Sequence, residues 1–545
     1  MIKRLLLLSG IVLYLNSAES AYGYHFVEPL EKSFIDARVT VWDGSSWDNG
    51  TPDQDSEIVI NGPLVLSQSL HVSKLTIAQG GSVTVPSGIS LTVTNEVINL
   101  TSSQNFIVEN GGNLIQTSSA TNVGEITVKR NSLPMVRNDM TFWSSPVSEQ
   151  NIRQFSPETL HNRFWNYEEA TDLFQEILTS NTDSRTFANG QGYSIRAKNT
   201  LSPNQSAIHQ GEFKGIPFNG DLQVEVTRLN NGFNLVGNPY ASDIDIAKFF
   251  KSNTSVKAIY IWTHEFPTTH VDYNNNYEVI TRGGSEHLNY DRIKVGDGFL
   301  VWVDETNNGE VVFNNLMRNV EITTKDSFWV QLSSETEVKN QINVSFIANA
   351  DDGYDSVYDK RVTEHLNTGV YSVVDVEKLV ISANSLPFEL NKIVKLGFKA
   401  LEAGTYTLGL PRKDGLFRNG QTIYLKDYLT QTAHNLSSSN YSFTSQAGEF
   451  NERFEIVFEE PLFLNVTDIK DLDAVLVYRS KDGHVINSSK ELIKSVEIFD
   501  VSGRKIDSRD QINQNQYQLK NYEKGIYILK ILDSKGKVTI KKISI

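Results

Sequence analysis

The chain has 545 residues, 39% of them hydrophobic and 10% aromatic, so it can form several folded domains and wholesale disorder is excluded. The formal net charge of −15 argues against nucleic acid as a general partner, because phosphate binding needs a basic face. The absence of cysteine excludes disulfides, thiolate metal sites and cysteine nucleophiles.

Residues 1–20 have the pattern of a signal peptide. Lys3 and Arg4 precede an apolar run over residues 5–15, and Ala18 and Ser20 place small residues where a signal peptidase cleaves. The apolar run is too short to cross a bilayer. We therefore expect the chain to be exported, with no transmembrane segment in the mature protein.

Residues 38–128 predict a short parallel β-solenoid. Strand-like stretches separated by turn residues repeat at a spacing of 23 residues. The matched pairs are Leu75 with Ile98, Ile77 with Leu100, Val83 with Phe106, Val85 with Val108, Gly88 with Gly111 and Leu91 with Leu114. Three strands per period suit one coil, which buries its apolar side chains only against a neighbouring coil. A small antiparallel sandwich is the alternative.

The next blocks continue the pattern of short strands and turns. Residues 129–325 predict an all-β domain with one helix over residues 241–251, for which Ser242 is the expected N-cap. Residues 326–460 predict a β-sandwich of jelly-roll or immunoglobulin-like kind, and residues 461–474 a linker. The expected fold class is therefore all-β and multidomain.

The last block, residues 475–545, differs in charge from the rest. It holds 14 Lys and Arg against 8 Asp and Glu, a net charge of +6, whereas the preceding chain carries −21. This asymmetry indicates that the block has a partner of its own, with an acidic one favoured.

Three features of this block occur in a fixed order. A strand over residues 496–500 is followed by a turn containing Gly503, then by the motif Lys524-Gly525-Ile526-Tyr527, then by the ending 541–543. The block resembles the type A sorting domain of the type IX secretion system of gliding and related Bacteroidota-type bacteria. One departure is that residues 479–482 stand where the family usually has a Pro-Asn-Pro turn.

The resemblance implies an immunoglobulin-like β-sandwich that carries its protein through an outer-membrane translocon and is then usually removed. It implies the type IX secretion machinery as a partner, and the outer cell surface or the extracellular space as the destination. The sorting motif would consist of Gly503, Lys524, Gly525 and Tyr527. Upstream, residues 143–146, 235–240 and 443–454 are similar to segments of large secreted flavobacterial-type surface proteins.

One group of side chains has the composition of a metal site. Its members are His264, Glu265, His270, Asp272, Glu286 and His287. A zinc-protease helix needs two His four residues apart, whereas these are six apart with Pro267 between them. We expect a solvated surface loop instead.

A second group could supply oxygen ligands to calcium. Asp351, Asp352 and Asp355 lie close together, but their spacing does not match a calcium-binding loop with its terminal glutamate. An acidic turn between strands is the favoured interpretation, with calcium as the one cofactor considered.

Trp42 and Trp47 bracket a turn-rich segment with two aspartates, and such side chains could contact a glycan. The favoured alternative is that the two indoles cap the open end of the solenoid core, because indole rings bury a large area.

No nucleophile elbow, phosphate-binding loop or dinucleotide fingerprint is present, so the chain is not expected to be an enzyme. The leading expectation is a structural or adhesive protein of the cell surface that contacts a polysaccharide or another surface ligand. The alternative is a carbohydrate-binding or polysaccharide-processing accessory protein of the cell envelope. An exported hydrolase is the third hypothesis.

Overall fold

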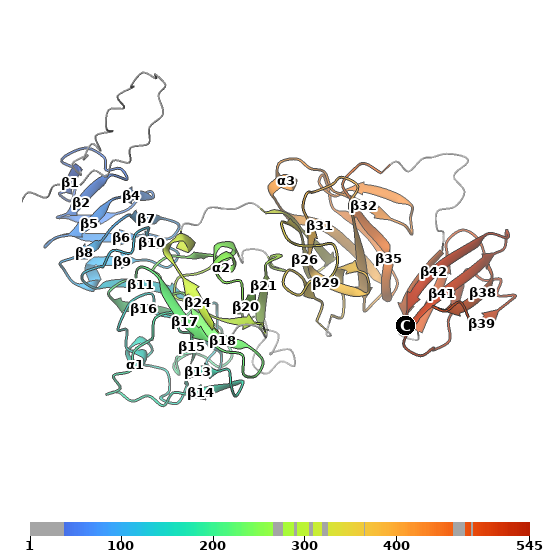
Figure 1. Ribbon diagram of the computed structural model, residues 1–545, viewed down its shortest axis with the longest axis horizontal. Coiled ribbons are helices and arrows are strands. Elements are labelled where there is room, and N and C mark those ends of the chain that lie inside the picture. Colours follow the sequence, from blue (N-terminus) through green and yellow to red (C-terminus); the bar gives the residue numbers. More distant parts are fainter. Residues whose placement is uncertain are drawn as a thin grey trace, which may run out of the picture.

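The computed structural model describes residues 38–264, 276–287, 291–304, 309–318, 325–363, 366–461, 475–480 and 483–545. Strands account for 51% of it and helices for 5%, which confirms the all-β class. Figure 1 shows four parts in a row, from the N-terminal solenoid in blue to the C-terminal module in red. The predicted signal peptide and residues 462–474 of the predicted linker lie outside the described residues. Within those residues, no helix is long and apolar enough to cross a membrane.

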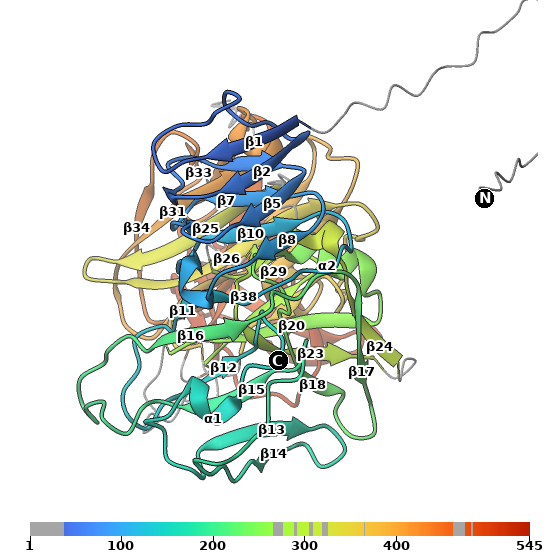
Figure 2. The same ribbon diagram turned by 90° about the vertical axis from the view of Figure 1, so that its left-hand side faces the viewer.

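The first part is a parallel β-solenoid of about four turns over residues 38–128, as predicted. It has three sheets, and the first contains β1 (Arg38–Trp42), β2 (Ser56–Ile60), β5 (Lys74–Ile77) and β8 (Val97–Asn99). The second contains β3 (Pro63–Val65), β6 (Ser82–Val85), β9 (Phe106–Val108) and β11 (Ile126–Asn131). The third contains β4 (Leu70–Val72), β7 (Ser90–Val93) and β10 (Asn113–Gln116). Alternate side chains point inward and form one core. Figure 2 shows the strands stacked one above another.

The predicted register is right for two sheets and wrong for the third. Val83 pairs with Phe106, and Leu91 with Leu114, as the repeat indicates. Leu75 pairs with Val97 instead of Ile98, so the spacing in this sheet is one residue shorter. A slip of one residue reverses the face of every side chain, and Leu100 is 53% exposed as a result.

Asn99 explains why apolar matching missed this register. It lies opposite Ile77 with its side chain inside the coil, where an apolar residue is expected. Its amide donates to the carbonyls of Ser102 at 3.0 Å and Glu125 at 2.7 Å. These bonds satisfy the buried amide, so a polar residue occupies an inward position of the coil.

The second part consists of small antiparallel sheets that begin where the solenoid ends, because β16 (Gln210–Gly215) pairs with β11. The strands are β12 (Met140–Trp143), β13 (Phe164–Glu168), β14 (Leu173–Glu176), β15 (Tyr193–Arg196), β17 (Leu222–Val226), β18 (Phe233–Gly237), β19 (Ile244–Asp245), β20 (Val256–Trp262), β21 (Tyr277–Thr281), β22 (Arg292–Ile293), β23 (Gly298–Val303) and β24 (Gly309–Phe313). The helical segments are η1 (Ser103–Asn105) in the solenoid, and α1 (Ile152–Phe155), α2 (Ile246–Ser252) and η3 (Asn315–Arg318) here.

Helix α2 overlaps the predicted helical region, but it starts five residues later and ends one residue beyond it. Its N-cap is Asp245, whose carboxylate accepts from the Lys248 amide at 2.9 Å. The expectation that Ser242 caps the helix is wrong. Ser242 is buried, and its hydroxyl accepts a hydrogen bond from the Arg318 side chain.

The third part is a strongly curved sheet with a large aromatic core. Its strands are β25 (Asp326–Ser334), β26 (Val338–Ile347), β27 (Lys360–Arg361), β28 (Gly369–Val374), β29 (Glu377–Ser385), β30 (Ile393–Ala400), β31 (Gly404–Asp414), β32 (Tyr424–Asp427), β33 (Thr432–Asn435), β34 (Tyr441–Ser445) and β35 (Gly448–Val457), with the short helix α3 (Gly415–Arg418). Strand β35 pairs with β30 on one edge and with β32 on the other.

The C-terminal module packs two antiparallel sheets face to face, as an immunoglobulin-like sandwich does. One sheet contains β36 (Val475–Ser480), β37 (Gly483–Ser488) and β40 (Gln516–Gln518), and it continues the sheet of the third part through the pairing of β35 with β36. The other contains β39 (Lys505–Arg509), β38 (Ile493–Asp500), β41 (Ile526–Asp533) and β42 (Val538–Ser544). Val477 and Ile486 from the first sheet meet Leu529 and Ile531 from the second in a core of their own.

A hairpin loop after β21 joins the second part to the third. The backbone of Arg282 donates to the carbonyl of Val357 at 3.2 Å, and the Trp329 indole donates to the carbonyl of Ser285 at 3.1 Å. Glu286 pairs with Lys360 at 2.8 Å. These contacts cross between segments far apart in the sequence, so the second and third parts share a specific interface.

Gly283 lies at the closest point of this interface. A Cβ atom on it would lie 2.0 Å from the carbonyl oxygen of Tyr358, so we expect Gly283→Val to force the two parts away from each other. Such overpacking costs about 1–3 kcal/mol. The expected result is a lower urea midpoint, with unfolding that separates into two transitions. Gly309→Val is the control, because nothing lies within 4 Å of a Cβ atom there. Equal midpoints for the two variants would contradict the interface.

Candidate functional sites

Trp42 and Trp47 lie together in the first coil of the solenoid. Their ring centroids are 5.2 Å apart, and both rings pack against the solenoid core while remaining half-buried. The Trp42 indole donates to the carbonyl of Pro63 at 2.9 Å, so its polar atom is already used. The arrangement fits a cap on the core better than an open platform for a sugar ring.

The three candidate metal ligands that the structure describes, His264, Glu286 and His287, do not form one group. Glu265, His270 and Asp272 lie outside the described residues, whereas Glu286 belongs to the interface with the third part. His287 contacts the buried carboxylate of Glu278. The expectation of a solvated loop is wrong for Glu286, whose side chain is mostly buried in an ion pair.

His264 is also buried, with 8% of its side chain exposed. Its Nδ1 lies 3.8 Å from Asp139 and its Nε2 lies 3.3 Å from the Thr141 hydroxyl. Burial lowers the pKa of His264 to about 4 and raises the pKa of Asp139. These contacts connect His264, which follows β20, to Thr141 inside β12.

The acidic turn that was considered for calcium is held by its own hydrogen bonds. Asp351 accepts from the Gly353 amide at 2.8 Å, Asp355 accepts from the Val357 amide at 2.8 Å, and Asp352 pairs with Lys392. Over the described ranges, no three His, Asp or Glu side chains are grouped as a metal site requires. The geometry therefore favours the acidic turn and does not support a calcium site at these aspartates.

The residues of the C-terminal motif occupy defined places in the module. Gly503 has a φ of +81° in the turn between β38 and β39, a conformation that favours glycine. Gly525 exchanges two backbone hydrogen bonds of 2.9 Å with Ile545, which ties the start of β41 to the end of β42. The Tyr527 hydroxyl donates to the carbonyl of Glu523 at 2.9 Å, and Lys524 is exposed.

The C-terminal module contacts the third part. Tyr478 of β36 stacks on Phe450 of β35 with a centroid distance of 4.6 Å, and Arg479 forms a β-bridge with Glu449. Lys541 pairs with Glu452 at 3.2 Å. Part of the excess positive charge of the module therefore faces carboxylates of the same chain.

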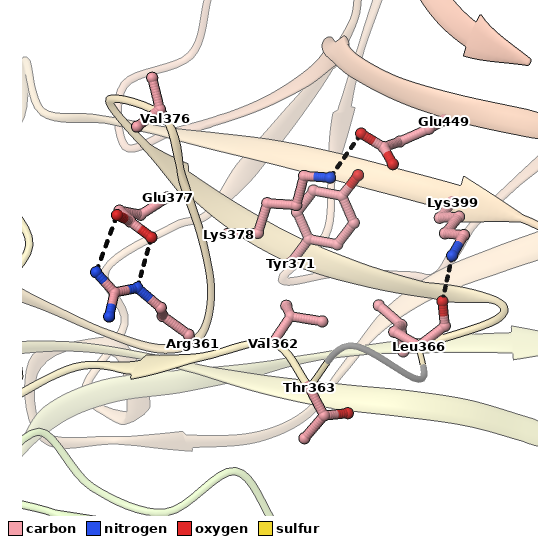
Figure 3. Close-up of a pocket in the computed structure, with 10 residues that line it drawn as sticks. All are labelled: Arg361, Val362, Thr363, Leu366, Tyr371, Val376, Glu377, Lys378, Lys399 and Glu449. Atoms are coloured by element: carbon pink, nitrogen blue, oxygen red, sulfur yellow. Dashed lines mark hydrogen bonds and ion pairs between the residues drawn. The ribbon is translucent and has the colours of Figure 1, made fainter. Parts of the chain in front are cut away.

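Close to this contact lies a cavity of about 290 Å³ on the third part, shown in Figure 3. It is lined by Arg361, Val362, Thr363, Leu366, Tyr371, Val376, Glu377, Lys378, Lys399 and Glu449. Arg361 binds Glu377 through two hydrogen bonds of 2.6 and 2.9 Å, and Lys399 donates to the carbonyl of Leu366 at 2.6 Å. The hydrogen bond from Arg361 lowers the pKa of Glu377.

A second polar cluster in this cavity joins three strands. Lys378 of β29 donates to Oε1 of Glu449 at 2.7 Å, and Asn451 of β35 donates to the same oxygen at 2.9 Å. The Tyr371 hydroxyl, from β28, donates to Oδ1 of Asn451 at 2.7 Å. Burial raises the pKa of Glu449, whereas its hydrogen bond to Lys378 and the charge of that lysine lower it. The lowering effects are together the larger, so the net shift of the pKa is downward.

Gly397 makes room for this cluster. A Cβ atom there would lie 2.0 Å from Cε2 of Tyr371 and 2.7 Å from Oδ1 of Asn451. The Tyr371 ring crosses β30 through this gap, and burial raises the pKa of its hydroxyl, so the group keeps its proton.

The cavity could not be predicted from the sequence, because its lining residues are spread over residues 361–449. One signal was available: Glu449 and Asn451 are two residues apart, so a strand places them on the same face. Tyr371 and Lys378 gave no such signal, because strand pairing alone brings them to that face.

Two family models match the chain. A domain of unknown function (DUF8693) matches residues 37–458, and a second domain of unknown function (DUF8694) matches residues 464–545. No curated protein matches the chain.

Proposed function

Because the chain belongs to the family of the domain of unknown function DUF8693, whose description states no activity, we propose its role from its architecture. The protein is exported and reaches the outer cell surface or the medium through the type IX secretion system, where it has a structural or adhesive role. Its C-terminal module acts as the sorting domain and is the part that contacts the secretion machinery.

The observation that carries this proposal is the C-terminal module itself. It has a hydrophobic core of its own beside Tyr478 and Val485, which pack into the core of the third part, and the family model for it starts at residue 464. Its turn at Gly503 and its motif residues Gly525 and Tyr527 lie in one compact two-sheet sandwich. Its net charge is opposite to that of the chain before it. These properties suit a separate sorting domain more than a part of the surface that binds a ligand.

The structural or adhesive role is supported by the shape of the molecule. A solenoid, a set of small sheets, a curved sheet and a sandwich follow one another in a row, which gives a long surface for a polymer or a solid support (Figure 1). The parts also contact one another through specific residues, which favours a defined arrangement of this surface.

We expect a chain truncated after Glu460 to stay in the periplasm of its native host, whereas the full chain reaches the cell surface. Fractionation and protease accessibility of intact cells measure the difference. Truncation uncovers Phe450, so a second variant keeps the module: Lys524→Glu changes an exposed motif residue and leaves the core intact. Its matched control is Lys494→Glu, an exposed lysine of the same module outside the motif. Surface display of the truncated chain would contradict the assignment of the module.

A further inference from the structure

Glu449 and the three side chains around it have the composition and contacts of a reaction centre rather than of a simple ion pair. Lys378 is an amine nucleophile once it loses a proton, Asn451 is a carboxamide, and both nitrogens contact the same carboxylate oxygen at 2.7 and 2.9 Å. The carbonyl oxygen of that carboxamide accepts a hydrogen bond of 2.7 Å from Tyr371. A nucleophile, a base, an electrophile and an oxyanion donor are therefore in contact.

We propose that Lys378 and Asn451 condense with each other to form an intramolecular isopeptide bond, with Glu449 as the base and Tyr371 as the oxyanion donor. The bond would join β29 to β35 across the two strands between them. This inference concerns the third part alone and does not rest on the proposed route of export.

The chemistry balances without a cofactor or a redox partner. Glu449 takes a proton from the Lys378 ammonium, and the free amine attacks Cγ of Asn451 to form a tetrahedral adduct. The oxygen of that adduct carries the negative charge and receives the hydrogen bond from Tyr371. Glu449 then delivers the proton to Nδ2, the bond between Cγ and Nδ2 breaks, and ammonia leaves. The nitrogen of the lysine gives up its second proton to the departing ammonia, so the products are an amide and ammonium.

The surroundings favour this reaction in three ways. The Asn451 orientation is set by two partners, since Oδ1 accepts from Tyr371 while Nδ2 donates to Glu449. The Glu449 side chain is 14% exposed, which limits the access of water to the carboxylate oxygen that both nitrogens contact. The Lys378 ammonium lies over the Tyr371 ring, 5.4 Å from its centroid, which keeps the amine on this face of the sheet (Figure 3).

The consequence would be a covalent constraint in a chain that has no cysteine. A bond between residues 378 and 451 closes a long loop, and such a constraint stabilises a fold mainly by restricting its unfolded state. The joined strands include β35, which also contacts the C-terminal module.

Intact mass spectrometry of the purified full chain tests the proposal. We expect a mass below that of the sequence by one ammonia, and a tryptic peptide pair linked between Lys378 and Asn451. Lys378→Arg, Asn451→Ala and Glu449→Gln should each restore the full sequence mass. Lys399→Arg is the matched control, a lysine of the same cavity that contacts a backbone carbonyl, and it should keep the deficit.

Two results would overturn the proposal. The first is a wild-type chain at full sequence mass. The second is a mass deficit that persists in Lys378→Arg. It would mean that ammonia is lost without the lysine, when the side chain of an asparagine cyclises on its own backbone. Three variants remove different partners, and circular dichroism establishes which of them fold, so the outcome does not depend on the folding of any single one.

Discussion

Replacing Arg453 with methionine should destabilise the third part by about 3–5 kcal/mol, the cost of leaving one partner of a buried ion pair without its counter-charge. Arg453 and Asp427 join β35 to β32 through bonds of 2.9 and 3.1 Å, and their side chains are 2% and 1% exposed. The guanidinium contacts the rings of both Phe443 and Phe454, at 4.6 and 4.7 Å from their centroids. Removing it leaves the Asp427 carboxylate in an apolar place with only neutral donors.

Urea unfolding of the full chain, followed by tryptophan fluorescence, measures this loss, because Trp329 reports on the third part. Arg504→Met is the control. Arg504 also pairs with an aspartate, but its side chain is 77% exposed, and such a pair contributes about 0–1 kcal/mol. The double variant Arg453→Met with Asp427→Leu should recover part of the loss, since both charges are then gone. A midpoint for Arg453→Met equal to that of Arg504→Met would show that the pair does not stabilise the fold.

The local features of the fold could be predicted from the sequence, because their causes lie within a few residues of each other. The alternation of apolar residues placed the inward side chains of β6 and β9, and the turn glycine Gly503 ended a strand where expected. The register of β8 could not be predicted, since it depends on the hydrogen bonds of a buried asparagine. Apolar matching assigns such a residue to the outside.

The contacts between parts could not be predicted, because no short stretch of sequence contains both partners. Gly283 and Gly284 look like a solvent-exposed turn, and only the nearby carbonyl of Tyr358 shows why a side chain is excluded at the first of them. The same limit applies to the cavity around Lys378, whose base and electrophile lie more than 70 residues further along the chain. Pairing of strands, rather than any motif, creates that site.

One family model covers the first three parts together, over residues 37–458. The contacts between these parts give a physical reason why they occur as one unit. The solenoid continues into the second part through β11 and β16, and the second part meets the third at the 281–287 loop. A protein whose surface depends on the relative placement of its parts needs such contacts. One of those at the solenoid end is built around an arginine.

Arg318 is fully buried and has no carboxylate among its hydrogen-bond partners in the described residues. Its guanidinium donates to the hydroxyl of Ser242, the side-chain oxygens of Asn219 and Asn315, and the carbonyl of Leu114 in the last coil of the solenoid, at 2.7–3.0 Å. Burial lowers the pKa of Arg318 to about 10, so it remains charged at neutral pH.

We expect Arg318→Met to lower the unfolding free energy of the solenoid and the second part by about 2–4 kcal/mol. Methionine fills a similar space but donates nothing, and each buried acceptor left without a partner costs about 1–3 kcal/mol, with partial relief because the cation no longer has to be buried. Arg292→Met is the control, since Arg292 is partly exposed and pairs loosely with Asp243 at 4.0 Å. The unfolding free energy, obtained from the urea transition that Trp42, Trp47 and Trp143 report, should fall for Arg318→Met. For the control it should stay within about 1 kcal/mol of the wild-type value. If both variants unfold at the wild-type midpoint, the solenoid does not depend on this arginine for its attachment, and the continuous sheet through β11 and β16 is sufficient to hold it.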